Sequence, residues 1–348
     1  MIRVLVAEDS VTARELLIEI LQSDAEIQVV GEAKNGVEAL KMTKRLRPSV
    51  VTMDIRMPLM DGFEATRRIM VEAPTPIVIV SASLDVREVE VSMHALRAGA
   101  LTVLAKPVGP GSPEFVEQAR SFLETVKAMS QVKVVRRWPE RARREPSPSL
   151  PTRRDGARPS VVAIAASTGG PAALSCILSD LSGDFPLPIL VVQHIARGFV
   201  DGLAAWLNTT SALPVKVAED GEALRGRIVY IAPDDRHLGV SARSGIAVST
   251  APPLDGFRPS ATFLFDSVAR VFGSSAVAII LTGMGRDGVA GLRAVREAGG
   301  CVVAQDEESS VVFGMPGAAV ASGVVQVTLP VGALARWLRE SIAPRAPE

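Results

Sequence analysis

Three residues, each placed where an apolar run meets a loop, could together form a catalytic triad. Ser167 follows the run VVAIAA in AIAASTGGPAAL, His194 ends PILVVQH, and Asp287 follows SAVAII in LTGMGRDGVAGL. A serine hydroxyl is a weak nucleophile alone, so it needs a base, and the base needs an acid that orients it. Backbone N–H groups at the start of a helix favour the negative charge that develops in acyl transfer. The three residue types therefore fit a nucleophile, its base and an acid that orients the base.

Other interpretations of these positions stay open at this level. The glycines after Ser167 could cradle a phosphate, but no lysine follows them and the G-x-G-x-x-G and G-x-S-x-G spacings are absent. The stretch could also be a bare turn. His194 is preferred to His237 as the base because it ends a strand as Ser167 does, although either could be structural, and His94 falls in a helical segment. Asp287 is preferred to other acids that look like solvated loop residues: Asp220, Asp234, Asp235, Asp255 and Asp306.

Alternating apolar and amphipathic segments predict the elements that carry these residues. Strand-like runs lie at 2–9, 27–33, 49–54, 76–82 and 101–107, with helical spacing between them and after the last, including 86–99. The alternation resumes with runs at 160–166, 188–194, 226–233, 245–250, 275–283 and 301–306. Such patterns are typical of doubly wound parallel sheets. We predict two α/β domains, a flavodoxin-like one at 1–129 and a Rossmann-like one at 160–348, joined by a linker at 130–159 that is rich in Pro and Arg.

The first domain places polar residues where its predicted strands end. Glu8 and Asp9 close the first strand, Asp54 the third, Ser81 the fourth and Lys106 the fifth. The carboxyl ends of parallel strands meet at one crevice. Three carboxylates there repel one another unless a cation lies among them, and Mg²⁺ takes oxygen ligands while leaving room for a phosphoryl oxygen. The pattern predicts a magnesium and phosphoryl site, with Lys106 beside the phosphoryl group.

With these residues, 1–129 resembles a response-regulator receiver domain. The resemblance implies that Asp54 accepts phosphate from a histidine kinase, and that Ser81 and Lys106 contact the phosphoryl group. It also implies Mg²⁺ held by a set of oxygen ligands, namely Glu8, Asp9, Asp54 and the carbonyl of Arg56. The sequence departs from the pattern at Val103, where receivers commonly carry an aromatic residue.

Residues 160 to about 342 resemble the catalytic domain of chemotaxis protein-glutamate methylesterases, the CheB family. The matching segments are AIAASTGGPAAL, VVQHIARGF, YIAPDDRHL, LTGMGRDGVAGL and AQDEESSVVFGMPGAA. The resemblance implies Ser167 as nucleophile, His194 as general base and acid, and Asp287 as its orienting carboxylate. It also implies that the Met284 N–H faces the oxyanion and that Thr168 lies beside the nucleophile. PSATFLF is less acidic than the form associated with the family.

The same resemblance implies a reaction, partners and regulation. The substrates are glutamate γ-methyl esters on the cytoplasmic domains of chemoreceptors, and receptor glutamines are deamidated by the same chemistry. A chemotaxis-type histidine kinase is the phosphodonor, Mg²⁺ serves only the receiver, and ester hydrolysis needs no cofactor. The unphosphorylated receiver is expected to cover the active-site face, and phosphorylation of Asp54 to relieve that inhibition.

Composition argues against several other classes of protein. Lys plus Arg and Asp plus Glu each total 38, and many basic residues fall in the linker, which disfavours a nucleic-acid partner or a DNA-binding output domain. No apolar run approaches the roughly 20 residues of a membrane span, and no signal peptide is evident. Two scattered cysteines fit a reducing compartment, so we expect a cytoplasmic protein without membrane insertion. The chief alternative is a receiver-controlled binding module without catalysis, which would hold a phosphorylated ligand over ASTGGP and GMGRDG.

Overall fold

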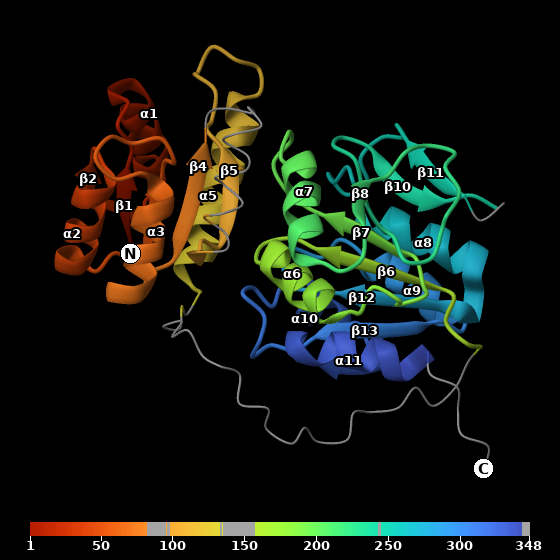
Figure 1. The fold of residues 1–348 in the computed structure, drawn as a ribbon. Coiled ribbons are helices and arrows are strands. Elements are labelled where there is room, and N and C mark those ends of the chain that lie inside the picture. Colours follow the sequence, from red (N-terminus) through yellow and green to blue (C-terminus); the bar gives the residue numbers. More distant parts are fainter. Residues whose placement is uncertain (82–94, 96–97, 133, 135–156, 243–244, 343–348) are drawn as a thin grey trace. The chain divides into compact units, whose positions relative to one another are not determined.

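The chain forms two compact units, Met1–Arg144 and Glu145–Glu348 (Figure 1). The computed structural model describes residues 1–348 except 82–94, 96–97, 133, 135–156, 243–244 and 343–348. Most of the helical segment expected at 86–99 and most of the linker expected at 130–159 lie outside the described residues. The domain boundaries inferred within that linker therefore stay predictions.

The first unit is a five-stranded parallel sheet in the order β2-β1-β3-β4-β5. The strands are Ile2–Ala7 (β1), Ile27–Ala33 (β2), Val50–Met53 (β3), Ile77–Ser81 (β4) and Thr102–Ala105 (β5). Its described helices are Val11–Gln22 (α1), Gly36–Leu46 (α2), Gly62–Glu72 (α3) and Phe115–Ser130 (α5). Ser10, Asn35 and Asp61 cap the first three helices by accepting a backbone N–H. This is the predicted flavodoxin-like sheet, whose strand order reverses between β1 and β3.

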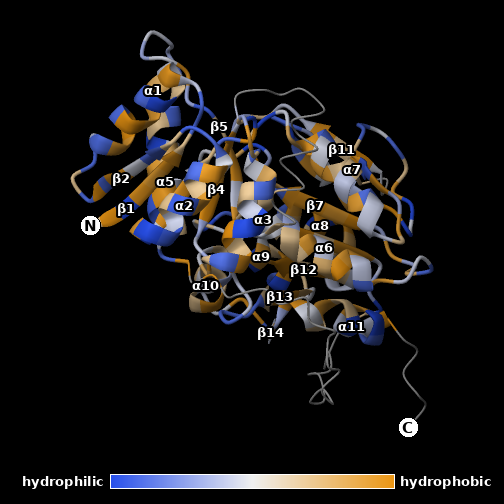
Figure 2. Cartoon of the chain, turned by 60° about the vertical axis from the view of Figure 1, so that its left-hand side comes forward, coloured by the Kyte–Doolittle hydropathy of each residue, from blue (hydrophilic) through white to orange (hydrophobic). Residues whose placement is uncertain are grey.

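The second unit has seven parallel strands in the order β14-β13-β12-β6-β7-β9-β8. The first four along the chain are Val161–Ala166 (β6), Ile189–Gln193 (β7), Val215–Val217 (β8) and Val229–Ile231 (β9). The others are Ala276–Ile280 (β12), Cys301–Gln305 (β13) and Val327–Leu329 (β14). The central strands are hydrophobic along their length (Figure 2), and all six residues of β6 are fully buried. Strands covered on both faces need such continuous apolar runs, so the predicted parallel sheet is confirmed.

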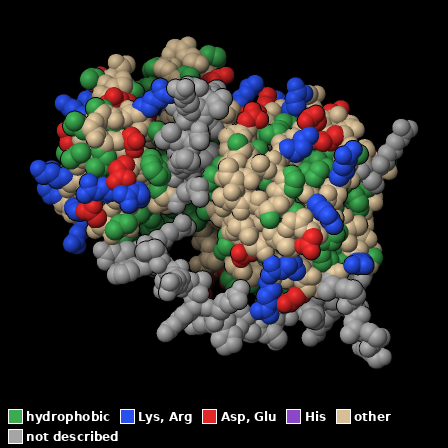
Figure 3. Space-filling view, viewed as in Figure 1, with side chains coloured by type: hydrophobic (Ala, Val, Ile, Leu, Met, Phe, Trp, Pro, Cys, Tyr) green, Lys and Arg blue, Asp and Glu red, His purple; other side chains and the backbone are tan. Residues whose placement is uncertain are grey.

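Helices cover both faces of the second sheet. Gly170–Asp180 (α6), Val200–Thr210 (α7) and Val331–Ile342 (α11) lie on the near face in Figure 1. Ala261–Phe272 (α8), which runs into the short 3₁₀ turn Gly273–Ser275, and Val289–Glu297 (α9) lie on the far face, and Met315–Ala321 (α10) contacts α9. Basic and acidic side chains are interspersed on the visible face of each unit (Figure 3). None of the described helices is both long and apolar enough to span a bilayer.

One predicted strand belongs to a different sheet. The run at 245–250 forms Ile246–Ser249 (β11), which pairs antiparallel with His237–Val240 (β10) in a separate two-stranded sheet. The reason is connection length, because residues 241–245 are too few for the crossover that parallel neighbours require. His237, assigned from the sequence to a turn, is therefore the first residue of a buried strand.

Candidate active site

The three candidate catalytic residues lie in loops that follow three neighbouring strands. β6 lies between β7 and β12, so the loops after these strands share one edge of the sheet. Ala166 pairs with Gln193 and Ala165 with Ile280, which brings the three strand ends level. The strands that follow β6 and those that follow β12 are added on opposite sides, so the strand order reverses between β6 and β12. Ligands bind at such topological switch points in open α/β sheets. The predicted gathering of Ser167, His194 and Asp287 at one edge thus follows from the strand order.

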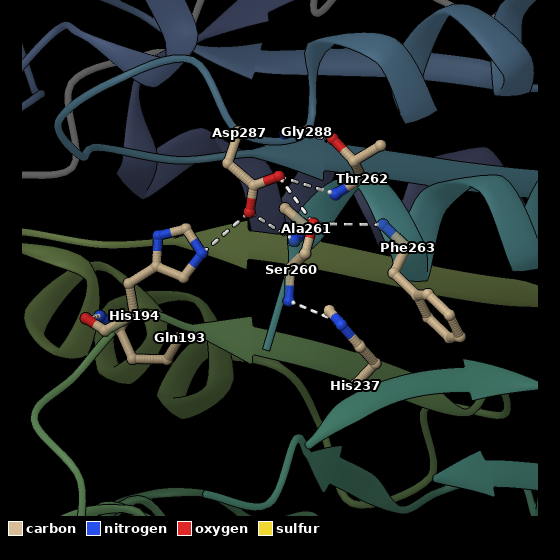
Figure 4. Close-up of polar contacts among 9 residues, drawn as sticks. All are labelled: Gln193, His194, His237, Ser260, Ala261, Thr262, Phe263, Asp287 and Gly288. Carbon is tan, nitrogen blue, oxygen red and sulfur yellow. Dashed lines mark hydrogen bonds and ion pairs between the residues drawn. The ribbon is translucent and has the colours of Figure 1, made fainter. Parts of the chain in front are cut away.

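Asp287 is held as a buried carboxylate at the start of α8 (Figure 4). Its Oδ1 accepts hydrogen bonds from Ser260 Oγ at 2.9 Å and from the Thr262 N–H at 3.1 Å. Its Oδ2 accepts from the Ala261 N–H at 2.6 Å and faces His194 Nε2 at 3.0 Å. Burial opposes ionisation, but the hydrogen bonds from His194, Ala261 and Thr262 outweigh it and lower the pKa of Asp287 to about 2. The acid is therefore ionised throughout the neutral pH range.

The contacts of His194 determine which ring nitrogen can act as a base. A carboxylate only accepts hydrogen bonds, so Nε2 carries the ring hydrogen and donates a hydrogen bond to Asp287. Nδ1 then holds the lone pair and points away from Asp287 in Figure 4. It is buried, and none of the described residues forms a hydrogen bond with it. The ring of Phe257 stacks on the imidazole with centroids 4.4 Å apart and an interplanar angle of 16°. Asp287 thus fixes the imidazole through Nε2 and Phe257 fixes one face of the ring, which leaves Nδ1 as the nitrogen that can accept a proton.

The backbone of Ser167 is fixed by neighbours on both sides. Its N–H donates to the Thr282 carbonyl at 3.0 Å, and its own carbonyl accepts from the Gly170 N–H at 2.9 Å and from Gln193 Nε2 at 2.7 Å. Among the described residues, no hydrogen bond joins Ser167 Oγ to His194. The candidate acid and base are therefore paired directly, while the candidate nucleophile lies in the adjacent turn. Catalytic hydrogen bonds are often long without substrate and shorten when it binds.

Backbone N–H groups are available beside the nucleophile. A Cβ atom on Gly283 would lie 2.6 Å from the Cβ of Ser167, so only glycine allows this loop to approach so closely. Within the described part of the chain, the N–H groups of Thr168 and Met284 donate to no protein acceptor. The N-cap of α6, Gly169, provides no side-chain hydrogen bond either. This arrangement leaves donors free for a developing oxyanion.

His237 has a different role from His194. It is fully buried, its Nε2 donates to the Pro252 carbonyl at 3.1 Å, and its Nδ1 accepts the Ser260 N–H at 3.2 Å. Its ring also stacks on Phe263 with centroids 4.6 Å apart. Both nitrogens are occupied, so His237 supports the residue that binds Asp287 and is not available as a base (Figure 4).

The first unit gathers its predicted acidic residues at its own switch point, after β1 and β3. Oxygens of Glu8, Asp9 and Asp54 all lie within 4.8 Å of one another. Lys106 Nζ lies 2.7 Å from Glu8 Oε2 and 3.0 Å from Asp54 Oδ1. Burial and the charge of Glu8 raise the pKa of Asp54 to about 6, against the opposing effect of Lys106. These carboxylate oxygens fit a hard divalent cation such as Mg²⁺, whose charge would relieve the repulsion.

The remaining predicted receiver residues lie around this cluster. Ser81 is buried at the end of β4, and the Lys106 N–H donates to the Ser81 carbonyl at 2.8 Å. Arg56 follows β3 with an exposed side chain. Val103 is buried within β5. The roles assigned to these residues by resemblance remain predictions.

Comparison with known proteins identifies the families of both domains. Residues 162–338 match the family model described as CheB methylesterase, and residues 4–118 match the response regulator receiver domain. Over 94% of its length, the chain is 58% identical to protein-glutamate methylesterase/protein-glutamine glutaminase 4 of Myxococcus xanthus (strain DK1622), covering 94% of that protein. The chain belongs to the CheB methylesterase family. The family and the receiver predicted from the sequence are thereby confirmed.

Other CheB-family proteins support the assignment along nearly the whole chain. The chain is 56% identical to protein-glutamate methylesterase/protein-glutamine glutaminase 3 of Anaeromyxobacter dehalogenans (strain 2CP-C), with 97% of this chain and all of that protein covered. The crystal structure of the CheB methylesterase catalytic domain of Thermotoga maritima matches with a TM-score of 0.51 and 41% identity. That match covers 53% of this chain and 99% of the other. The second unit is therefore a CheB-type methylesterase domain.

The raised pKa of Asp54 predicts how this CheB-family receiver responds to pH. The pKa is about 6 in the folded state and near 3.8 otherwise, so the ionised group destabilises the fold. That destabilisation is absent below about pH 4 and complete above about pH 6. Without Mg²⁺, Asp54→Asn should therefore stabilise the receiver by about 1 to 3 kcal/mol at pH 7 and by nothing at pH 4. Denaturant unfolding at both pH values measures the difference.

A matched control for this prediction is Asp61→Asn. Asp61 is exposed and caps α3, and asparagine caps a helix equally well. This variant should show no pH-dependent gain. If Asp54→Asn is no more stable than Asp61→Asn at pH 7, the ionised carboxylate of Asp54 does not destabilise the folded receiver.

Proposed function

We propose that this CheB-family chain hydrolyses glutamate γ-methyl esters on the cytoplasmic domains of chemoreceptors, with Ser167 as nucleophile. Methanol is released, and the same acyl transfer on a glutamine side chain releases ammonia. The observation that carries the proposal is the hydrogen-bonded pair of Asp287 and His194. The Nδ1 atom of His194 accepts no hydrogen bond from the described residues, so it is available as a base. The alternative of a binding module explains neither this oriented base nor the free N–H groups beside it.

The reaction follows from these contacts. Ser167 Oγ attacks the side-chain carbonyl carbon while His194 Nδ1 takes the hydroxyl proton, and Asp287 stabilises the imidazolium that forms. The carbonyl oxygen becomes an oxyanion facing the N–H groups of Thr168 and Met284. His194 then gives its proton to the departing methoxide oxygen, which leaves an ester between Ser167 and the substrate. Water cleaves this ester by the same steps, with His194 as base, and frees the glutamate carboxylate.

The receiver residues prepare Asp54 for phosphorylation by a histidine kinase. Glu8, Asp9 and Asp54 would hold Mg²⁺, which neutralises charge during phosphoryl transfer. Asp54 offers the accepting oxygen, and Lys106, already 3.0 Å from it, pairs with the negative charge. Both acids that flank Asp54 come from the end of β1, so the strand order itself assembles the acceptor site.

The test combines product release with covalent labelling. Membranes containing chemoreceptors radiolabelled on their methyl groups should release labelled methanol when the chain is added. A fluorophosphonate should label Ser167, because an activated serine attacks it. Labelling elsewhere with no methanol release would contradict the proposal and favour the binding module.

Regulation by Asp54 is a separate prediction. A small-molecule phosphodonor with Mg²⁺ should stimulate methanol release by the whole chain but not by a fragment spanning 160–348. The fragment should be more active than the unphosphorylated chain, because it lacks the receiver that we expect to inhibit the esterase. Asp54→Asn should keep basal activity and lose the stimulation, since an amide cannot form an acyl phosphate. Equal rates for chain and fragment, with no response to the phosphodonor, would mean that the receiver does not gate the esterase.

A further inference from the structure

The side chain of Gln193 links the nucleophile turn to the base turn. Gln193 is the last residue of β7 and is only 3% exposed. Its Nε2 donates to the carbonyl oxygen of Ser167 at 2.7 Å and to the carbonyl oxygen of His194 at 2.9 Å. One amide group therefore uses both its hydrogens to join the backbones of the proposed nucleophile and base.

The orientation of this amide is fixed by its partners. Two carbonyl oxygens at these distances require the NH₂ end, because the oxygen end of the amide only accepts hydrogen bonds. Oε1 consequently points the other way, where it is buried and has no hydrogen-bond partner in the part of the chain that the structure describes. A Cβ atom on residue 170 would lie 2.1 Å from Oε1, so the glycine there makes room for the amide. Burying an amide oxygen without a partner destabilises the fold, so apolar packing does not account for a glutamine here.

We propose that Gln193 is a positioning residue of the esterase, which sets the distance between Ser167 and the imidazole of His194. This inference rests on the proposed function. Asp287 and Phe257 fix the ring of His194, but within the described residues neither is hydrogen-bonded to the backbone of Ser167. The backbones are already joined one residue away, because the His194 N–H donates to the Ala166 carbonyl at 2.9 Å. The Gln193 amide adds a direct link between the carbonyl groups of Ser167 and His194, and it acts through the backbone rather than on the substrate. Small displacements between reacting groups are enough to slow catalysis strongly.

The test compares Gln193→Met with wild type in the full-length chain. Methionine keeps the length and approximate shape of the side chain but donates no hydrogen bond. The kcat for methanol release should fall about 10- to 100-fold with little change in KM, because receptor binding does not involve the buried amide. The rate of fluorophosphonate labelling at Ser167 should fall by a similar factor, since it reports the nucleophile and base without the receptor.

The matched control is Gln326→Met. Gln326 Oε1 accepts the Val302 N–H at 2.8 Å near the start of β13, away from the catalytic edge, so kcat and labelling should stay at wild-type values. If Gln193→Met does not fold, Gln193→Asn replaces it, because its shorter amide cannot span both carbonyls and predicts the same loss of kcat. Wild-type kcat and labelling in a folded Gln193 variant would overturn the inference. Ser167→Ala, assayed in parallel, separates this failure from that of the proposed function, which fails only if that variant still releases methanol.

Discussion

Ser167→Ala should reduce methanol release by at least about 10⁴-fold while the chain stays folded. Alanine removes only the hydroxyl, and the contacts that hold Ser167 in place are made by its backbone N–H and carbonyl, so the turn keeps its position. Without Oγ no acyl-enzyme can form. Fluorophosphonate labelling should disappear with the activity, and both can be measured on the same preparation.

Ser175→Ala is the matched control for this loss. Ser175 lies within α6, where its hydroxyl donates a hydrogen bond to Thr210 Oγ1 at 3.4 Å. Its removal should leave methanol release and labelling unchanged. Substantial residual turnover in Ser167→Ala would assign the nucleophile to another residue, and unchanged labelling would point to the same conclusion independently.

Asp287→Asn is expected to have the second largest effect, a loss of about 10³- to 10⁴-fold in kcat. Both carboxylate oxygens accept a backbone N–H, Oδ1 from Thr262 and Oδ2 from Ala261. The NH₂ of asparagine would therefore face an N–H donor in either orientation. If the NH₂ faces His194, the ring no longer donates from Nε2, and Nδ1 is no longer held as the free base. A pH–rate profile of the residual activity, together with kcat, measures this change.

Asp220→Asn provides the comparison for Asp287→Asn. Asp220 accepts the Val248 N–H at 2.8 Å, and asparagine can accept the same bond with its carbonyl oxygen. This variant should keep wild-type kcat. If Asp287→Asn also kept wild-type kcat, the buried pair between Asp287 and His194 would have no part in the reaction.

The sequence predicted which candidate site residues lie in loops at the carboxyl ends of apolar strands. Ser167 and His194 directly follow β6 and β7, Asp287 lies in the loop after β12, and parallel strands bring such ends together. The antiparallel β10–β11 pair was missed, although the short connection at 241–245 was a usable signal. The position of His237 was missed for the same reason.

The supports of the site were harder to predict because they depend on contacts between distant segments. Ser260 stands directly before the amphipathic segment that forms α8, so its role as N-cap was readable. Its second hydrogen bond, to Asp287, was not, because nothing local connects the two. The stacking of Phe257 on His194 and the two bonds of Gln193 likewise arise only when separate loops meet.

The position of β6 in the middle of its sheet has a consequence for local unfolding. Its backbone is hydrogen-bonded to strands on both sides and all its residues are fully buried, so its amides can exchange with solvent only when the whole unit opens. The three-residue edge strand β8 has a neighbour on one side only and can separate at lower cost. Ser167, the proposed nucleophile, thus follows a strand whose amides should exchange slowly, and fraying at the sheet edge can proceed while the geometry around Ser167 is kept.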